Sequence, residues 1–121
     1  MHIRECLDQK ETGYEQLLRI TKAHSHPVRF KIAEILSEQE ACVCHLEHAL
    51  GQRQAYASQQ LAVLKNAGIL RERRQGTFIF YRLSGSAIIN VLNSLQLAAG
   101  TNGNDIQSIQ RPDNCPCPTC K

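Results

Sequence analysis

The sequence predicts a mainly α-helical domain that contains one β-hairpin and ends in a polar, cysteine-rich tail. Two observations predict it. Apolar residues recur at helical spacing on both sides of residues 69–83, where the period changes to two. Residues 101–114 are rich in Asn, Gly and Gln, which is typical of a flexible tether. Because 121 residues suffice for one domain, we expect an N-terminal arm (1–13), a domain (14–99) and a flexible tail (100–121).

Five apolar stripes predict five helices, four before the hairpin and one after it. Pro27 suits the first turn of the second helix, where its missing N–H costs nothing. Gly51 and Gly68 supply stops for the short third helix and for the fourth. The stripes are Tyr14, Leu17, Leu18 and Thr21; Val28, Ile32, Ile35 and Leu36; Val43, Leu46, Ala49 and Leu50; Ala57, Leu61 and Leu64; and Ile88, Val91, Leu92 and Leu95.

The hairpin is predicted from two alternating segments, residues 69–73 and 78–83, that a turn at residues 74–77 joins. Its tip is basic. The last helix carries more apolar surface than one stripe requires, because Ile89 and Leu97 add to it. We therefore expect the first and last helices to form a homodimer interface.

The net charge of +3 is distributed unevenly. Residues 52–82 hold six basic side chains and one acid, whereas residues 34–51 hold four acids and no Lys or Arg. A localised basic stretch is typical of a phosphate-binding surface. On charge alone, a solvated basic face explains the pattern equally well.

The order of elements distinguishes these alternatives. Two helices, a short helix, a glycine turn, a further helix and a hairpin are the order of a winged helix-turn-helix, in which the helix after the turn enters the major groove of double-stranded DNA. The hairpin is the wing. The polar residues of that helix and the basic wing are suited to base edges and phosphates. The expected DNA contacts are Gln54, Ala55, Tyr56, Ser58, Gln59, Gln60, Lys65, Arg71, Arg73, Arg74 and Gln75.

Over about residues 14–99 the chain resembles the arsenic-repressor-like (ArsR/SmtB) family of metal-sensing repressors. The resemblance rests on Cys-Val-Cys-His-Leu, on Ala-Ser-Gln-Gln-Leu-x-x-Leu-x-x-Ala-Gly-Ile-Leu, and on Arg-Arg-Gln-Gly-Thr followed by Tyr-Arg-Leu. It implies a repressor that binds operator DNA. The family commonly has His where this chain has Gln60, so a base contact made by that His is altered here. The family's zinc site on the last helix is absent, because residues 86–99 contain no Asp, Glu or His.

The six cysteines form two groups and one single residue, and in a reducing cytosol they indicate metal ligation or redox chemistry. Cys42 and Cys44 lie where the resemblance places the Cys-x-Cys pair that binds arsenite, antimonite, cadmium or lead. Residues i and i+2 of a regular helix point about 200° apart, so both sulfurs reach one ion only if the first turn is non-helical or unwinds. Some relatives carry another cysteine at the position of Glu47. The candidate further ligands are Cys115, Cys117 and Cys120 of the tail, or Cys6.

These observations predict a homodimeric repressor of a metal-resistance operon. We expect it in the cytoplasm, because the chain has neither an apolar run of membrane-spanning length nor the apolar segment of a signal peptide. Arsenite or antimonite is the favoured inducer, cadmium or lead is the alternative, and no organic cofactor is expected. A second hypothesis makes the thiols a redox or persulfide switch. A third is a thiol enzyme or metal chaperone that uses the tail. His45 and His48, three residues apart on the short helix, are alternative metal ligands, but we expect them to be exposed helix residues.

Overall fold

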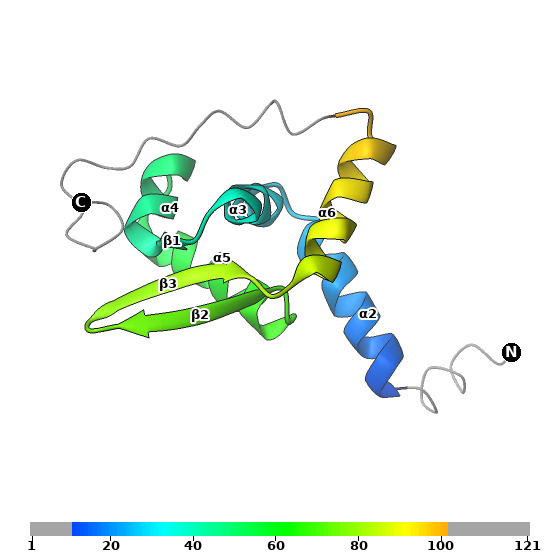
Figure 1. Cartoon of the computed structure of the whole chain (residues 1–121), viewed down its shortest axis with the longest axis horizontal. Coiled ribbons are helices and arrows are strands. Elements are labelled where there is room, and N and C mark those ends of the chain that lie inside the picture. Colours follow the sequence, from blue (N-terminus) through cyan, green and yellow to red (C-terminus); the bar gives the residue numbers. More distant parts are fainter. Residues whose placement is uncertain (1–10, 102–121) are drawn as a thin grey trace, which may run out of the picture.

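The computed structural model describes residues 11–101 and has the predicted order of helices with one hairpin (Figure 1). The helices are α2 (Glu11–His24), α3 (Pro27–Glu38), α4 (Val43–Leu50), α5 (Gln54–Asn66) and α6 (Ser86–Ala98). The strands are β1 (Ala41–Cys42), β2 (Leu70–Gln75) and β3 (Phe78–Leu83). The predicted fold class is thereby confirmed. Within this part of the chain, no helix is long and apolar enough to cross a membrane.

Local sequence signals set the helix ends as predicted. Pro27 opens α3, and the His26 side chain caps that helix by accepting a hydrogen bond from the backbone N–H of Val28 at 3.2 Å. Gly51 ends α4 in the left-handed conformation, with φ of 65°, which glycine adopts without a Cβ penalty. Helix α2 begins at Glu11, inside the segment predicted to be an N-terminal arm.

The wing belongs to a three-stranded antiparallel sheet in the order β1-β3-β2. Strand β1 was not predicted from the sequence, because two residues within an apolar run show no alternation. Cys42 of β1 pairs with Phe80 of β3. Strands β2 and β3 pair along their whole length and are joined at Gly76, which has φ of 61°. The predicted turn at residues 74–77 is therefore shorter, because Arg74 and Gln75 belong to β2.

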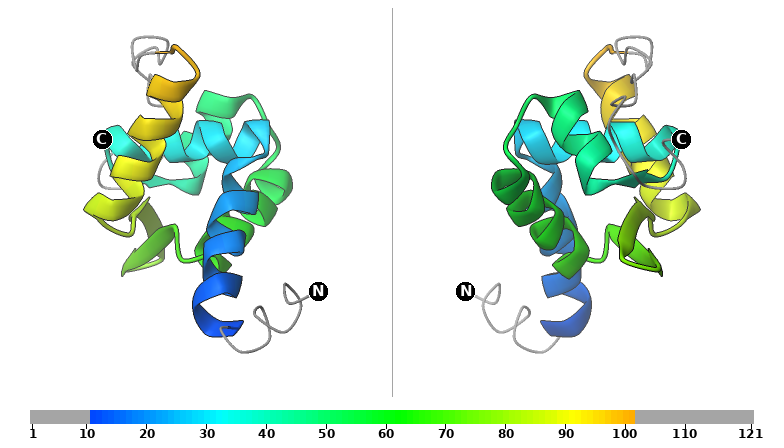
Figure 2. Two further views of the ribbon diagram at one scale, coloured as in Figure 1. Left: turned by 90° about the vertical axis from the view of Figure 1, so that its right-hand side faces the viewer. Right: turned by 90° about the vertical axis from the view of Figure 1, so that its left-hand side faces the viewer.

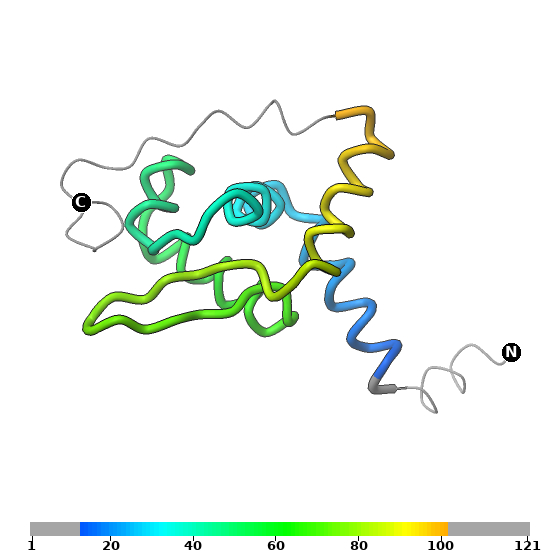
Figure 3. The backbone as a smooth tube through the Cα atoms, viewed as in Figure 1, coloured from blue at the N-terminus to red at the C-terminus, as the bar shows by residue number. Residues whose placement is uncertain are grey.

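Helix α3 is the centre of the core. It contacts each of the other helices and β3, and Figure 1 shows it between α4 and α6, above the wing. Ile32, Ile35 and Leu36 supply its buried face. Helix α2 lies at the edge instead, and its N-terminal half projects beyond the other elements (Figure 3). The core is thus built around α3, which together with α4 also contacts α5.

Candidate DNA interface and thiol pair

Helix α5 is positioned by α4 and by the core. The chain turns at Gly51, and α5 begins at Gln54 after Arg53, which has extended backbone angles. Leu61 and Leu64 of α5 are buried in one cluster with Leu46 of α4. Because apolar side chains fix one face of α5, its other face is turned outward.

The outward face of α5 holds most of the residues predicted to contact DNA. Tyr56 is half-buried. The predicted residues that are exposed are Gln54, Ala55, Ser58, Gln59 and Lys65. The same face also exposes residues that the sequence analysis did not select, namely Ala62, Val63 and Asn66, with Arg53 just before the helix. Helical spacing from Ala55 and Gln59 would have found them. The face offers amides, a hydroxyl and small apolar groups, which suit base edges.

Gln60 does not lie on the outward face, so its predicted role as a DNA contact is wrong for this arrangement. Its side chain is buried, and its Oε1 accepts a hydrogen bond from Nη1 of Arg29 at 3.2 Å. The physical reason is helical spacing, since Gln60 precedes the buried Leu64 by four residues and shares its face. A buried amide is stable only when it is hydrogen-bonded, and Arg29 satisfies it.

The wing presents its residues to two different faces, because side chains alternate along a strand. Glu72 of β2 forms an ion pair with Lys65 of α5, with 2.8 Å between Oε1 and Nζ. The face that holds Glu72 is therefore the α5 side of the wing. By alternation, Arg74 lies on that same face and is exposed. Arg71, Arg73 and Gln75 belong to the opposite face.

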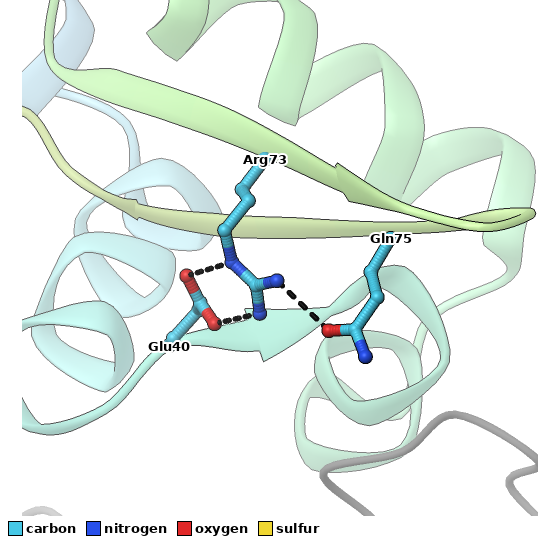
Figure 4. Close-up of polar contacts among 3 residues, drawn as sticks. All are labelled: Glu40, Arg73 and Gln75. Atoms are coloured by element: carbon cyan, nitrogen blue, oxygen red, sulfur yellow. Dashed lines mark hydrogen bonds and ion pairs between the residues drawn. The ribbon is translucent and has the colours of Figure 1, made fainter.

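Arg73 is held on that opposite face by Glu40 (Figure 4). Its Nε and Nη2 donate to the two carboxylate oxygens of Glu40 at 3.2 and 2.6 Å, and Nη1 donates to Oε1 of Gln75 at 2.9 Å. The guanidinium also lies 4.6 Å from the centre of the Phe80 ring, a favourable cation–π contact. The predicted wing arginines therefore differ: Arg74 is available beside α5, whereas Arg73 already has an acidic partner.

The ion pair affects the acidity of Glu40. The hydrogen bonds from Arg73 lower the pKa of the Glu40 carboxyl, the charges of Arg73 and Arg82 lower it further, and partial burial opposes them. A lowered carboxyl pKa means that the contact stabilises the fold above the ordinary pKa of glutamate. The contribution is lost as the pH falls through the lowered value.

Cys42 and Cys44 begin α4 in different conformations. Cys42 is buried, has extended backbone angles (φ −88°, ψ 168°) and caps the helix, because its Sγ accepts a hydrogen bond from the backbone N–H of His45 at 3.4 Å. Cys44 lies in the first turn and is half-buried. Cys42 and Phe80 form a small buried cluster, and Cys44 and Phe78 pack against it. The non-helical first position that a two-sulfur site requires is thus already present.

The histidines of α4 divide between burial and exposure. His48 is exposed as predicted, whereas His45 is completely buried, contrary to the prediction. Within residues 11–101, no three His, Cys, Asp or Glu side chains gather as metal ligands do. The other candidate ligands, Cys6, Cys115, Cys117 and Cys120, lie outside the described residues. The described part of the chain therefore contributes two sulfurs to the predicted ion site.

An α5 helix held by α4, with an exposed polar face beside an exposed wing arginine, defines a winged helix-turn-helix DNA-binding regulator. Residues 26–72 match the family model "Bacterial regulatory protein, arsR family". The biofilm growth-associated repressor of Xylella fastidiosa is 38% identical over 92 residues, which cover 76% of this chain and 78% of that protein. The chain belongs to the ArsR family, whose members are transcriptional regulators and not enzymes.

Several relatives are named for resistance to metals or metalloids, and two of them match more than half of this chain. The cadmium resistance regulatory protein CadC homolog of Staphylococcus aureus is 41% identical over 66 residues, 54% of each chain. The arsenical resistance operon repressor of Escherichia coli is 41% identical over 68 residues, 55% of this chain and 58% of that one. These matches cover little more than half of each protein.

Solved structures share the fold. The repressor BigR from Xylella fastidiosa superposes with a TM-score of 0.64 at 35% identity, covering 78% of this chain and 94% of that one. The homodimeric winged helix-turn-helix DNA-binding domain of a Mycobacterium bovis protein gives a TM-score of 0.73 at 30% identity, covering 77% of this chain and 86% of that one.

Proposed function

We propose that this chain is a homodimeric repressor that leaves its operator when Cys42 and Cys44 bind a soft metal or metalloid ion. The position of Cys42 carries the proposal. This one residue pairs with β3 of the wing and caps α4, the helix that supports α5. A change at its sulfur therefore bears on both parts of the DNA-binding surface. As a regulator of operator DNA, the protein would act in the cytoplasm.

The DNA-binding part of the proposal rests on α5 and the wing. With Gln60 buried, the exposed residues best suited to reading bases are Ser58 and Gln59. A glutamine amide pairs with the N6 and N7 atoms of adenine, and a small apolar side chain such as Ala62 accommodates a thymine methyl group. Arg74, on the same side as α5, is placed to bind a phosphate.

The homodimer is supported by an apolar surface that the described chain leaves uncovered. The predicted stripe of α2 faces outward, with Tyr14, Leu17 and Leu18 exposed by 44%, 56% and 38%. On α6, Val91 and Leu95 are exposed by 38% and 43%. Figure 1 places both helices at the end of the molecule opposite the wing tip, and the left view of Figure 2 faces that end. Exposed apolar surface of this kind is typical of interfaces.

Soft ions suit the thiol pair better than hard ones, because thiolates are soft ligands. Cys42 supplies a sulfur from β1 and Cys44 supplies one from α4. An arsenite or cadmium ion requires further ligands, which the sequence offers at Cys6 or in the tail. Binding would draw on a sulfur that now caps α4, so reorientation of Cys42 would disturb the start of α4 and its pairing with Phe80. Relatives named for arsenical and cadmium resistance support this class of ion.

A gel-shift titration tests the proposal. The purified protein is bound to a duplex selected by it from a random pool, and arsenite, antimonite, cadmium and lead are added separately at micromolar concentration. We expect at least one of them to release the DNA, because ion binding reorganises α4. If every ion leaves the complex intact while the protein remains folded, ion-dependent release is wrong.

The two faces of the wing give a second prediction. Arg74→Ala should weaken binding to all duplexes by a similar factor and reduce the slope of log K against log[salt] by about 1, as expected for one lost phosphate contact. The matched change Arg73→Ala removes the same charge from the face opposite α5, so it should leave the slope nearly unchanged. Equal effects of the two variants would contradict the assignment of the faces.

A thiol redox switch is the second candidate function, because the same two cysteines are close in the chain and a structural relative, HlyU from Vibrio cholerae, has a structure described as reduced. Oxidation would join two thiols in a disulfide, releasing two protons and passing two electrons to a peroxide. Mass spectrometry distinguishes the two candidates. Release that accompanies the loss of two hydrogens, without added ion, would favour oxidation over ligation.

A further inference from the structure

Helix α2 is joined to α5 by two polar links, although it packs chiefly on α3. The first link is direct: Nε2 of Gln16 donates to the backbone carbonyl of Ala67, just beyond the last turn of α5, at 2.8 Å. Gly68 makes room for it, because a Cβ at this position would lie 3.0 Å from the Gln16 amide nitrogen and the backbone has φ of 78°. A larger residue at position 68 would therefore push Gln16 away.

The second link passes through Arg29 of α3. Its Nε and Nη2 donate to the carbonyls of Ala23 and Lys22 in the last turn of α2, at 3.1 and 3.2 Å. Its third nitrogen, Nη1, donates to the buried Gln60 of α5 at 3.2 Å. The guanidinium is planar and holds its donors in a fixed fork. Arg29 thus fixes the C-terminal end of α2 relative to the middle of α5.

We propose that Gln16, Arg29 and Gln60 are positioning residues that set the angle between α2 and the recognition helix α5, and thereby the spacing of operator half-sites that the homodimer accepts. We call this set the polar joint. The inference rests on the proposed homodimer, in which α2 contributes to the interface. With α2 fixed against its counterpart in a second copy, the polar joint determines where each α5 points.

Half-site spacing is sensitive to this angle. A dimer of helix-turn-helix proteins places its two recognition helices about one DNA turn apart, at 34–36 Å. One added base pair moves a half-site by about 3.4 Å and rotates it by about 35°. A rigid connection between α2 and α5 penalises that displacement, whereas a loose connection tolerates it. Spacing tolerance is therefore a property that a residue with a purely stabilising role would not change.

The test compares operators of different spacing. A symmetric duplex selected by the wild-type protein is remade with one base pair added or removed between its half-sites. Anisotropy titrations then give the spacing penalty, which is the ratio of affinities for the selected and altered duplexes. Gln16→Met and Gln60→Met remove the links with little change in side-chain length, and Arg29→Lys keeps the charge but not the fork.

We expect each substitution to reduce the spacing penalty by about fivefold, the equivalent of one hydrogen bond, and the double variant Gln16→Met/Gln60→Met by more. Arg19→Met is the matched control, because it removes an exposed ion pair of α2 with Glu15, 2.7 Å long, outside the polar joint. Circular dichroism and sedimentation check folding and dimerisation. If the double variant does not fold, the single variant Gln16→Met provides the test, because Gln16 is only half-buried.

The negative results can be told apart. If the variants fold, dimerise and keep the wild-type spacing penalty, the polar joint does not set spacing and this inference is overturned, while the proposed function stands. If the wild-type protein binds as a monomer, the homodimeric function fails and the inference fails with it. If it binds as a dimer but shows no spacing penalty, only this inference is overturned.

Discussion

Replacing both Leu17 and Leu95 with glutamate is expected to leave a folded monomer whose affinity for a two-site operator falls by about 10²- to 10⁴-fold. The fall is the loss of avidity when two linked binding units become separate. Folding should survive, since Leu17 is 56% exposed and Leu95 43% exposed in the single chain. Surface substitutions of this kind usually change stability by about 0.5 kcal/mol or less. Sedimentation equilibrium gives the mass, and a gel shift gives the affinity.

Asn93→Glu is the matched control for this change. It introduces the same charge on the same helix, at a polar and exposed position. Asn93 precedes Leu95 by two residues, so the two side chains point about 200° apart. We therefore expect Asn93→Glu to remain dimeric and to bind DNA normally. A dimer that persists in Leu17→Glu/Leu95→Glu would show that α2 and α6 do not form the interface.

The double variant Cys42→Ser/Cys44→Ser is expected to bind operator DNA like the wild type and to lose its response to soft ions completely. Serine is a good N-cap residue, so it can replace the Sγ of Cys42 in bonding the backbone N–H of His45. The start of α4 should therefore be retained. A hydroxyl is a poor ligand for a soft ion, whereas a thiolate is a good one.

Absorbance in the sulfur-to-metal charge-transfer region, followed together with a gel shift, measures both effects. His48→Gln is a suitable control, because this exposed side chain belongs to α4 but not to the thiol pair. Replacing Cys6, or Cys115, Cys117 and Cys120 together, then identifies the source of the remaining ligands. Release of DNA from the Cys42→Ser/Cys44→Ser variant at the wild-type ion concentration would exclude the thiol pair as the sensor.

Periodicity predicted the helices and the hairpin correctly, because each is long enough to show its own period. Strand β1 is too short for that, and it became evident only from its pairing with Phe80. The burial of Gln60 was available from its spacing to Leu64, yet the polarity of glutamine suggested an outward position. Gln60, which Arg29 contacts, lies 31 residues from it, and Glu40, which Arg73 contacts, lies 33 residues from it. Such contacts depend on how α3, α5 and the wing are brought together.

The two faces of the wing sheet carry different groups of residues, which allows one group to be redesigned without the other. Lys65 and Glu72 mark the side that faces α5, while Glu40, Arg73 and the two cysteines occupy the other. The proposed ion ligands and the side of the wing that faces α5 therefore lie on opposite faces of one sheet. Residues 40–44 could be exchanged for a segment with different ligands while the base-reading side chains stay as they are. A reporter built in this way would answer to a new ion through an unchanged promoter.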